Sequence, residues 1–360
     1  MIQKTMKTPR KLLILVSLLI VVMAAAWLLR RRSQQPPDSV RMLPEGEVIL
    51  YANLRPVRLW ESGTRKAETS EAGKSGSANQ NAGPAPSIQI EGDYQNFISQ
   101  TGIQFERDLD EIAMSRRDTP DHRDTESAEV ITGRFDEPKL TDYLGKISSL
   151  RETYRDHTIF VIPHDGHNVR VCLLGNGRVA ITNMPSGDPI RGMVDSLAKL
   201  PAGPTLAQLY YDHVPLASLG WMITRVEANS SGPQLPNGWS FDFLQNTTTV
   251  LSVRFAGDVL VRADVITAGE KEAKHVMDGA TSFLALYQTV ATSVSPKGTD
   301  QDVKAALSSI EVHQEKSAAV FNATLSQRFL KKLVSEAQTE ATSSAPSPTP
   351  SPAKMKPKKP

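Results

Sequence analysis

The chain has 360 residues, of which 39% are hydrophobic, and a formal net charge of +2. Seven basic and no acidic residues precede residue 33, and four lysines lie among the last seven residues, so residues 33–353 carry a charge of −9. Because an acidic body is a poor match for phosphate backbones, no nucleic-acid partner is expected. The single cysteine, Cys172, excludes an intramolecular disulfide and a cysteine-based zinc cluster.

The first predicted element is an uncharged apolar run, Leu12 to Leu29, which basic residues flank on both sides. As a helix, its 18 residues would extend about 27 Å, close to the roughly 30 Å hydrocarbon core of a bilayer. We therefore expect residues 1–32 to be a basic n-region and a single-pass signal anchor in the lipid bilayer. Cleavage after Ala24 to Ala26, as in a signal peptide, is the alternative. The basic residues on the two sides slightly favour a cytoplasmic N-terminus, which would make the C-terminal part periplasmic.

Residues 33–45 are expected to be a linker, because Ser33 to Ser39 is polar and contains two prolines. Glu47 to Leu54 has the β-branched and aromatic residues of a strand. Residues 61–87 consist largely of Gly, Ser, Ala, Asn and Gln without apolar periodicity, which predicts a disordered insertion.

The next segments alternate between helical and extended patterns. Tyr94 to Gln100 and Phe105 to Met114 have the apolar spacing of short helices, and Ser115 to Ser127 is expected to be a charged loop. Ala128 to Phe135 is predicted to be a strand. Asp136 is then expected to cap the N-terminus of a helix that runs to Leu150.

A hairpin is the clearest local prediction of the first half. Thr158 to Ile162 is predicted to be a strand, and Val169 to Asn183 a hairpin about Asn176-Gly177, a pair suited to a type I′ turn. This turn would place Leu174 opposite Val179 and Cys172 opposite Ile181. Both faces of the hairpin would then be apolar and packed, with Cys172 as a small core residue. Ile190 to Leu200 is expected to be a helix.

The fold class expected is α+β, with two similar strand/helix halves at 46–200 and 201–338, antiparallel hairpins packed against helices, and one transmembrane helix before them. The halves share a strand, turn, strand, helix pattern, at Val169 to Leu200 and again at Ser309 to Ala337. Residues 339–360, rich in Pro, Ser and Lys, are expected to be a disordered tail. The remaining elements predicted for the second half are a strand at Leu206 to His213, a hairpin at Thr249 to Ile266 about Gly257-Asp258, a helix at Glu270 to Ala291, strands at Ser309 to His313 and Ala318 to Thr324, and a helix at Ser326 to Ala337.

The candidate metal ligands are His164, Asp165 and His167, which place two imidazoles and a carboxylate within four residues. A transition-metal site needs three or four converging ligands, and no second ligand motif accompanies them. Asp165-Gly166 is also a preferred turn pair, so an exposed hairpin loop is the competing interpretation. The sequence contains no HExxH motif and no GxSxG elbow, and it assigns no catalytic or cofactor-binding residue; no cofactor is expected.

The succession of LPEGEVILYANLRPVR, YQNFISQTGIQFERDLDEIAMS, EVITGRFDEPKLTDYL, HTIFVIP and GRVAITN resembles uncharacterised bacterial envelope proteins that have an N-terminal membrane segment and an exterior α+β domain. The resemblance implies a single-pass protein of the bacterial inner membrane. We therefore expect a non-enzymatic binding or structural module of the cell envelope, with an envelope protein or a cell-wall polymer as a possible partner. The alternative is an envelope hydrolase or metal-dependent enzyme whose active site is built from dispersed residues.

Overall fold

The structure is a computed structural model that describes residues 35–56, 92–119, 125–164, 166–227, 244–294 and 301–329. The predicted anchor at Leu12 to Leu29, the insertion at 61–87 and the tail at 339–360 lie outside the described residues. Within the part of the chain that is described, no helix is long and apolar enough to cross a membrane.

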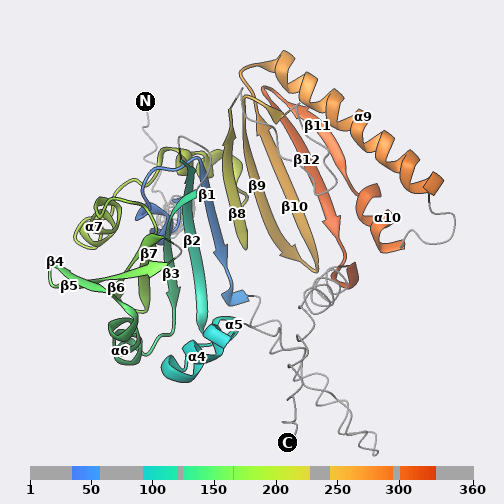
Figure 1. The fold of residues 1–360 in the computed structure, drawn as a ribbon. Helices are drawn as coiled ribbons and strands as arrows, with labels where there is room; N and C mark the ends of the chain where they lie inside the picture. Colours follow the sequence, from blue (N-terminus) through green and yellow to red (C-terminus); the bar gives the residue numbers. More distant parts are fainter. Residues whose placement is uncertain are drawn as a thin grey trace, which may run out of the picture.

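The described residues fold around one twelve-stranded antiparallel sheet flanked by helices, which confirms the α+β class (Figure 1). The strand order is β11-β12-β10-β9-β8-β1-β2-β3-β7-β6-β5-β4. The strands are β1 (Val48–Asn53), β2 (Leu109–Asp118), β3 (Thr125–Gly133), β4 (Leu150–Tyr154), β5 (His157–His164), β6 (His167–Gly175), β7 (Arg178–Thr182), β8 (Gly220–Val226), β9 (Thr247–Ala256), β10 (Asp258–Ile266), β11 (Glu311–Glu315) and β12 (Ala318–Leu325). The helices are α2 (Asp38–Arg41), α4 (Gly92–Thr101), α5 (Phe105–Asp108), α6 (Glu137–Ile147), α7 (Asp188–Asp195), the 3-10 helix η1 (Thr205–Leu209), α8 (Tyr210–His213), α9 (Glu270–Val294) and α10 (Gln301–Ser308).

The strand pairing follows the same order on the two sides of the β1–β8 pair. On one side β1, β2 and β3 are consecutive neighbours, and β7 returns to pair with β3 after a helix. On the other side β8, β9 and β10 are consecutive neighbours, and β12 returns to pair with β10 after α9 and α10. The hairpin β4–β5 extends the first side only.

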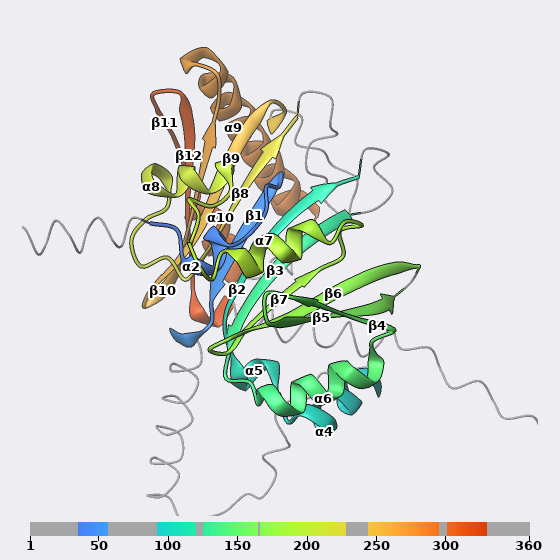
Figure 2. The same cartoon turned by 90° about the vertical axis from the view of Figure 1, so that its left-hand side faces the viewer.

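Different helices pack on the two faces of the sheet. One, here called the α7 face, carries Ile49, Ile223 and Val250, which form the largest apolar cluster with α2, α7, η1 and the segment that follows α8. The opposite face, here called the α9 face, is covered at one end by α4 and α6 and at the other end by α9 (Figures 1 and 2). Alternate residues of each strand therefore project from opposite faces of the sheet.

The expected linker at 33–45 is wrong over most of its length. Pro36 is already buried, and Val40, Met42 and Leu43 are at most 5% exposed within the largest apolar cluster. The short α2 helix packs against the sheet because its apolar residues face inward, although the prolines before it are typical of a spacer. Pro36 therefore already belongs to the folded body.

Two predicted elements have the wrong secondary structure. Only Phe105–Asp108 of the predicted helix Phe105 to Met114 is helical, and β2 begins at Leu109 and continues to Asp118, into the predicted charged loop. The predicted strand Leu206 to His213 is instead helical, as η1 and α8. Its buried residues Leu206 and Ala207, together with Val214 directly after it, have helical spacing, which favours a turn of helix on the sheet over an extended strand.

The hairpin β6–β7 forms at the predicted turn, and Asn176 and Gly177 have the positive φ angles of 54° and 68° that a type I′ turn requires. Its register was predicted wrongly, because a bulge between Leu173 and Gly175 shifts the pairing, so that Cys172 lies opposite Ala180. Both faces are nevertheless packed, as predicted. Asp136 caps α6 by accepting a hydrogen bond from the Lys139 backbone N–H at 3.2 Å, but the helix ends at Ile147 and Leu150 begins β4.

Candidate functional site

The middle of the α9 face is apolar and lies between the helices that cover its two ends. We call it the central apolar face and define it by eight side chains on six neighbouring strands, β10, β9, β8, β1, β2 and β3. All eight are half-buried, and none belongs to an apolar cluster of the described residues. They are Leu50, Ile112, Met114, Ile131, Met222, Leu251, Val253 and Val261.

Strand pairing makes this surface continuous. Leu50 lies opposite Met114 on one side and Met222 on the other, and Met222 lies opposite Leu251. Directly opposed residues in antiparallel strands project from the same side of the sheet, so these side chains share one surface. Because Leu50 belongs to β1 and Met222 to β8, the surface exists only where the two halves of the sheet meet.

Helices pack on the two ends of the α9 face, on either side of the central apolar face. Towards β4, Phe160, Val171 and Val179 pack against Leu140 and Leu144 of α6. Towards β11, α9 covers the sheet, with Val276 packed against Val265 and Ala319. Between these helix-covered ends, β2, β1, β8 and β9 follow one another, and three spacings of about 4.8 Å give a width of roughly 14 Å.

Two polar side chains border the central apolar face. Glu129 lies opposite Met114 on the neighbouring strand, and burial raises the pKa of its carboxyl group above the ordinary value. Thr249 lies next to Leu251 on the same side of β9, and its Oγ1 atom is buried with no hydrogen-bond partner among the described residues. Burial of the Glu129 carboxylate and of the Thr249 hydroxyl costs free energy, because both groups lose contact with water. Their surroundings are therefore apolar.

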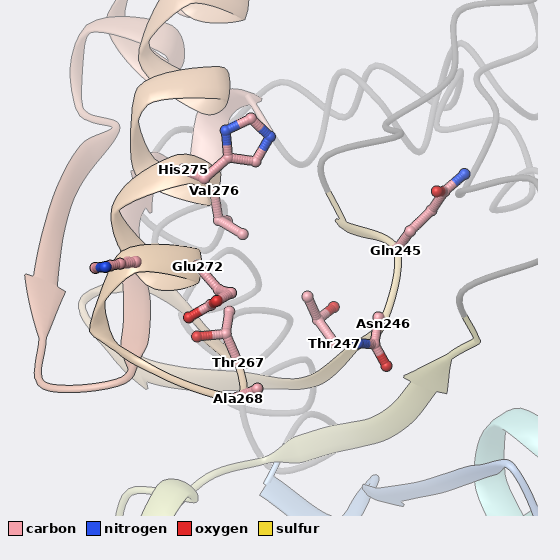
Figure 3. A pocket seen from close by; sticks show the side chains of 9 residues that line it. Gln245, Asn246, Thr247, Thr267, Ala268, Glu272, His275 and Val276 are labelled. Atoms are coloured by element: carbon pink, nitrogen blue, oxygen red, sulfur yellow. The ribbon is translucent and has the colours of Figure 1, made fainter.

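A pocket of about 430 Å³ adjoins the central apolar face at its α9 end (Figure 3). Figure 3 shows Glu272, His275 and Val276 on α9, with Gln245, Asn246 and Thr247 on the segment opposite. The pocket reaches the sheet through Thr247, which lies on the same side of β9 as Thr249 and Leu251. The complete lining is Gln245, Asn246, Thr247, Thr267, Ala268, Lys271, Glu272, His275 and Val276.

The candidate metal ligands lie elsewhere, at the tip of the β5–β6 hairpin. His164 and His167 are opposite one another and exposed, and Asp165 lies outside the described residues. The described part of the chain contains no group of three or more His, Cys, Asp or Glu side chains arranged to hold a metal ion. The structure thus places the two histidines together without a third described ligand.

Cys172 is completely buried, and burial raises the pKa of its thiol to about 12. At neutral pH this thiol is protonated, which makes it a poor nucleophile. Its surroundings agree with the core role expected from the hairpin.

A charged network on the α7 face was not predicted from the sequence. Asp264 is 3% exposed and accepts hydrogen bonds from Arg262 Nε at 2.7 Å and from His213 Nδ1 at 3.0 Å. Arg262 also reaches Glu315, whose other partner is His313 at 3.0 Å. These residues come from α8, β10 and β11, so only the fold brings them together.

The central apolar face was also missed, although the signal was present. Each of its strands alternates apolar residues on both faces, a pattern typical of strands covered on both sides. What the sequence does not reveal is the pairing of β1 with β8, which joins the two apolar stripes into one surface.

No protein-family model and no curated protein matches this chain. Among solved structures, "Structure of crystal form I of TP0453" aligns with a TM-score of 0.41 at 11% identity, covering 84% of this chain and 98% of that chain. "Structure of crystal form IV of TP0453" aligns with a TM-score of 0.39 at 11% identity, covering 82% and 96%. Similarity at this level supports no statement about the function of this chain.

Proposed function

We propose that this protein is a non-enzymatic binding module of the bacterial cell envelope, anchored in the inner membrane by Leu12 to Leu29 and exposed on the periplasmic side. We propose further that its partner is another envelope protein, which places an amphipathic helix on the central apolar face. The observation that carries the proposal is the apolar surface between α6 and α9, on which no helix of the described residues packs.

A helix is the occupant that the surface fits best. The α9 face already accepts helices at both ends, through α6 and α9, with the same kind of apolar side chains. The width of roughly 14 Å that no described helix covers exceeds the 10–12 Å diameter of a helix. Sheet faces in two-layer folds are stabilised by helices laid on them.

The side chains of the surface can also adapt to a helix whose apolar residues differ in shape. Met114 and Met222 lie on the two sides of Leu50, and methionine side chains adapt to irregular apolar surfaces. Recognition by apolar residues at helical spacing is a recurring mode of protein binding.

The test is site-specific photo-crosslinking in cells that express the full chain. A photo-reactive residue at Met222 or Leu251 samples the central apolar face, and one at Arg254 or Arg225 samples the opposite side of the same strands. We expect positions 222 and 251 alone to crosslink to one apolar helical segment of the same envelope protein. A peptide of that segment should bind the purified protein, and Met222→Lys should weaken binding by about tenfold, the cost of burying one charge on an apolar surface.

Three results would overturn this proposal. The first is that the adducts at positions 222 and 251 contain phospholipid. The second is that these adducts join to residues 57–91 or 228–243 of this same chain. Equal crosslinking at Arg254 would also contradict a face-specific partner.

The anchorage is tested separately by mass. If Leu12 to Leu29 is an uncleaved anchor, the membrane-bound protein has the full mass of 39.4 kDa. A mass corresponding to residues 27–360 would show cleavage after Ala26 and refute the anchor.

The enzyme alternative makes a different prediction. A metal-dependent site that includes His164 and His167 would make the thermal midpoint fall on chelation, since metal binding stabilises the native state. We expect no change with EDTA. A fall that His167→Ala abolishes would favour the metal-dependent enzyme instead.

We also infer that the two halves are structural repeats. The connectivity β1-β2-β3-helix-β6-β7 corresponds to β8-β9-β10-helix-β11-β12, and the equivalent strands β1 and β8 pair antiparallel. The strand, turn, strand part of the pattern expected at Val169 to Leu200 and Ser309 to Ala337 supports this inference through β6-β7 and β11-β12. In the second half β8, and not the segment Leu206 to His213, takes the place that β1 has in the first.

A further inference from the structure

We propose that the side of the body formed by α2, η1 and α8 rests on the lipid bilayer that holds the chain's own anchor, with Tyr211 and Leu216 in the interfacial layer. This proposal depends on the membrane anchorage proposed above. It adds an orientation, in which the body lies against the membrane with one defined side.

The first argument is the length of chain between anchor and body. The basic cluster that ends the predicted anchor includes Arg32, and Pro36 is already buried. The four residue steps from Arg32 to Pro36 span at most about 13–14 Å when fully extended. So short a connection holds the nearest surface of the body within reach of the lipid headgroups.

The second argument is where this connection meets the body. Arg41 Nη1 contacts Gln35 Oε1 at 3.4 Å, and Arg41 Nε donates a hydrogen bond to the Pro201 carbonyl oxygen at 2.9 Å. The Glu45 carboxylate accepts hydrogen bonds from the Thr205 backbone N–H and Oγ1, each at 3.0 Å. The chain therefore enters the body beside the segment that leads into η1 and α8.

Apolar packing ties these elements together. Val40 of α2 and Leu206 and Ala207 of η1 belong to one buried cluster, and Val214 after α8 joins them. Figure 2 shows α2 and α8 on the same side of the molecule, with β4 on the other side.

The third argument is what this side exposes. Tyr211 is 44% exposed and Leu216 is 55% exposed, although both lie next to the buried Val214. Tyrosine is enriched at membrane–water interfaces, where its ring is apolar and its hydroxyl stays hydrated. An aliphatic side chain beside it adds apolar area for the same layer.

The test uses the full chain reconstituted in vesicles of phosphatidylcholine and phosphatidylglycerol. Leu216→Cys carries a polarity-sensitive fluorophore, and Leu150→Cys in β4 is the matched control, since Leu150 is 54% exposed and lies on the other side. The native Cys172 is completely buried and does not compete for the label. Lipids with a doxyl group near the headgroup then report contact with the bilayer.

We expect the label at position 216 to shift to shorter wavelength and to be quenched about twofold or more, as for a side chain 5–10 Å into the interface. The label at position 150 should keep its emission in water. Tyr211→Ser should reduce quenching at position 216 without changing the far-UV circular dichroism. Equal and weak quenching at both positions would overturn the proposal. It would also be overturned if the emission at position 216 shifted only when another protein was added, and not when lipid was present.

The same samples separate the two proposals. If the chain does not float with the vesicles, the anchorage itself fails. If it floats and position 216 is not quenched, the anchorage stands and only the docked orientation is refuted.

Discussion

Asp264 offers the sharpest test of the energetics of this fold. Its carboxylate is 3% exposed and is held by Arg262 Nε at 2.7 Å, Arg262 Nη2 at 3.3 Å and His213 Nδ1 at 3.0 Å. Asp264→Asn keeps the shape and one acceptor oxygen but removes the charge that these donors stabilise. Glu315, at 3.3 Å, is then the anionic partner that remains for Arg262 among the described residues.

The expected loss can be estimated from these contacts. Hydrogen bonds to charged groups contribute about 1.5–3 kcal/mol each, and breaking a buried ion pair costs about 3–5 kcal/mol. The Arg262 side chain is 27% exposed, so water replaces part of the interaction. We therefore expect Asp264→Asn to lower the free energy of unfolding by about 2–3 kcal/mol, or about 4–12 °C in thermal midpoint for a body of this size.

The measurement is thermal and urea unfolding of the full chain, followed by circular dichroism. Asp278→Asn is the control, because the Asp278 carboxylate pairs with Lys274 at 2.9 Å where both side chains are more than half exposed. This control should cost less than about 0.5 kcal/mol. If the two variants unfold alike, Asp264 is not a structural anion and the reasoning from its burial is refuted.

The remaining predictions concern the central apolar face, a turn and the buried thiol. Glu129→Gln should raise the thermal midpoint at pH 7. Burial raises the pKa of Glu129 in the folded state, so the ionised carboxylate destabilises the protein above that pKa. The gain in thermal midpoint should therefore disappear as the pH falls through the folded pKa. An equal gain at pH 4 and pH 7 would contradict this. Gly177→Ala should destabilise by more than about 2 kcal/mol, since a Cβ atom would overlap the Gly133 carbonyl oxygen, whereas Gly166→Ala, also at positive φ but in open space, should cost only about 1–2 kcal/mol in urea unfolding. Cys172 should react with a thiol reagent only as fast as the protein unfolds, and rapid labelling of the native protein would disprove its burial.

Local patterns predicted most strands and the long helix α9. Strand β1, the β9–β10 hairpin and α9 lie within a few residues of their predicted ranges, because their alternation or 3.6-residue period is strong. The segment from Phe105 to Met114 was misread since Phe105, Leu109, Ile112 and Ala113 also fit a helical period. In the fold, Ile112 and Ala113 instead face the two opposite sides of a strand packed on both faces.

The candidate site could not be predicted because it depends on long-range pairing. Leu50 and Met222 are far apart in sequence, and only the contact between β1 and β8 makes them neighbours. The register of β6–β7 shows the same limit at short range, where one extra residue at Leu174 shifts which side chains share a face. The sequence indicated which residues are apolar, and the tertiary fold decided on which of them no described helix packs.

The central position of β1 has a consequence for how the chain folds. It is the first strand of the described residues to be synthesised, and it has a partner for one edge, β2, long before β8 exists to pair with the other. Until residue 226 has emerged, its second edge is an unpaired template for any other extended chain. Contacts of such wide sequence separation form slowly, so the half-made protein is most vulnerable to strand exchange and to chaperone capture at the line where its two halves later join.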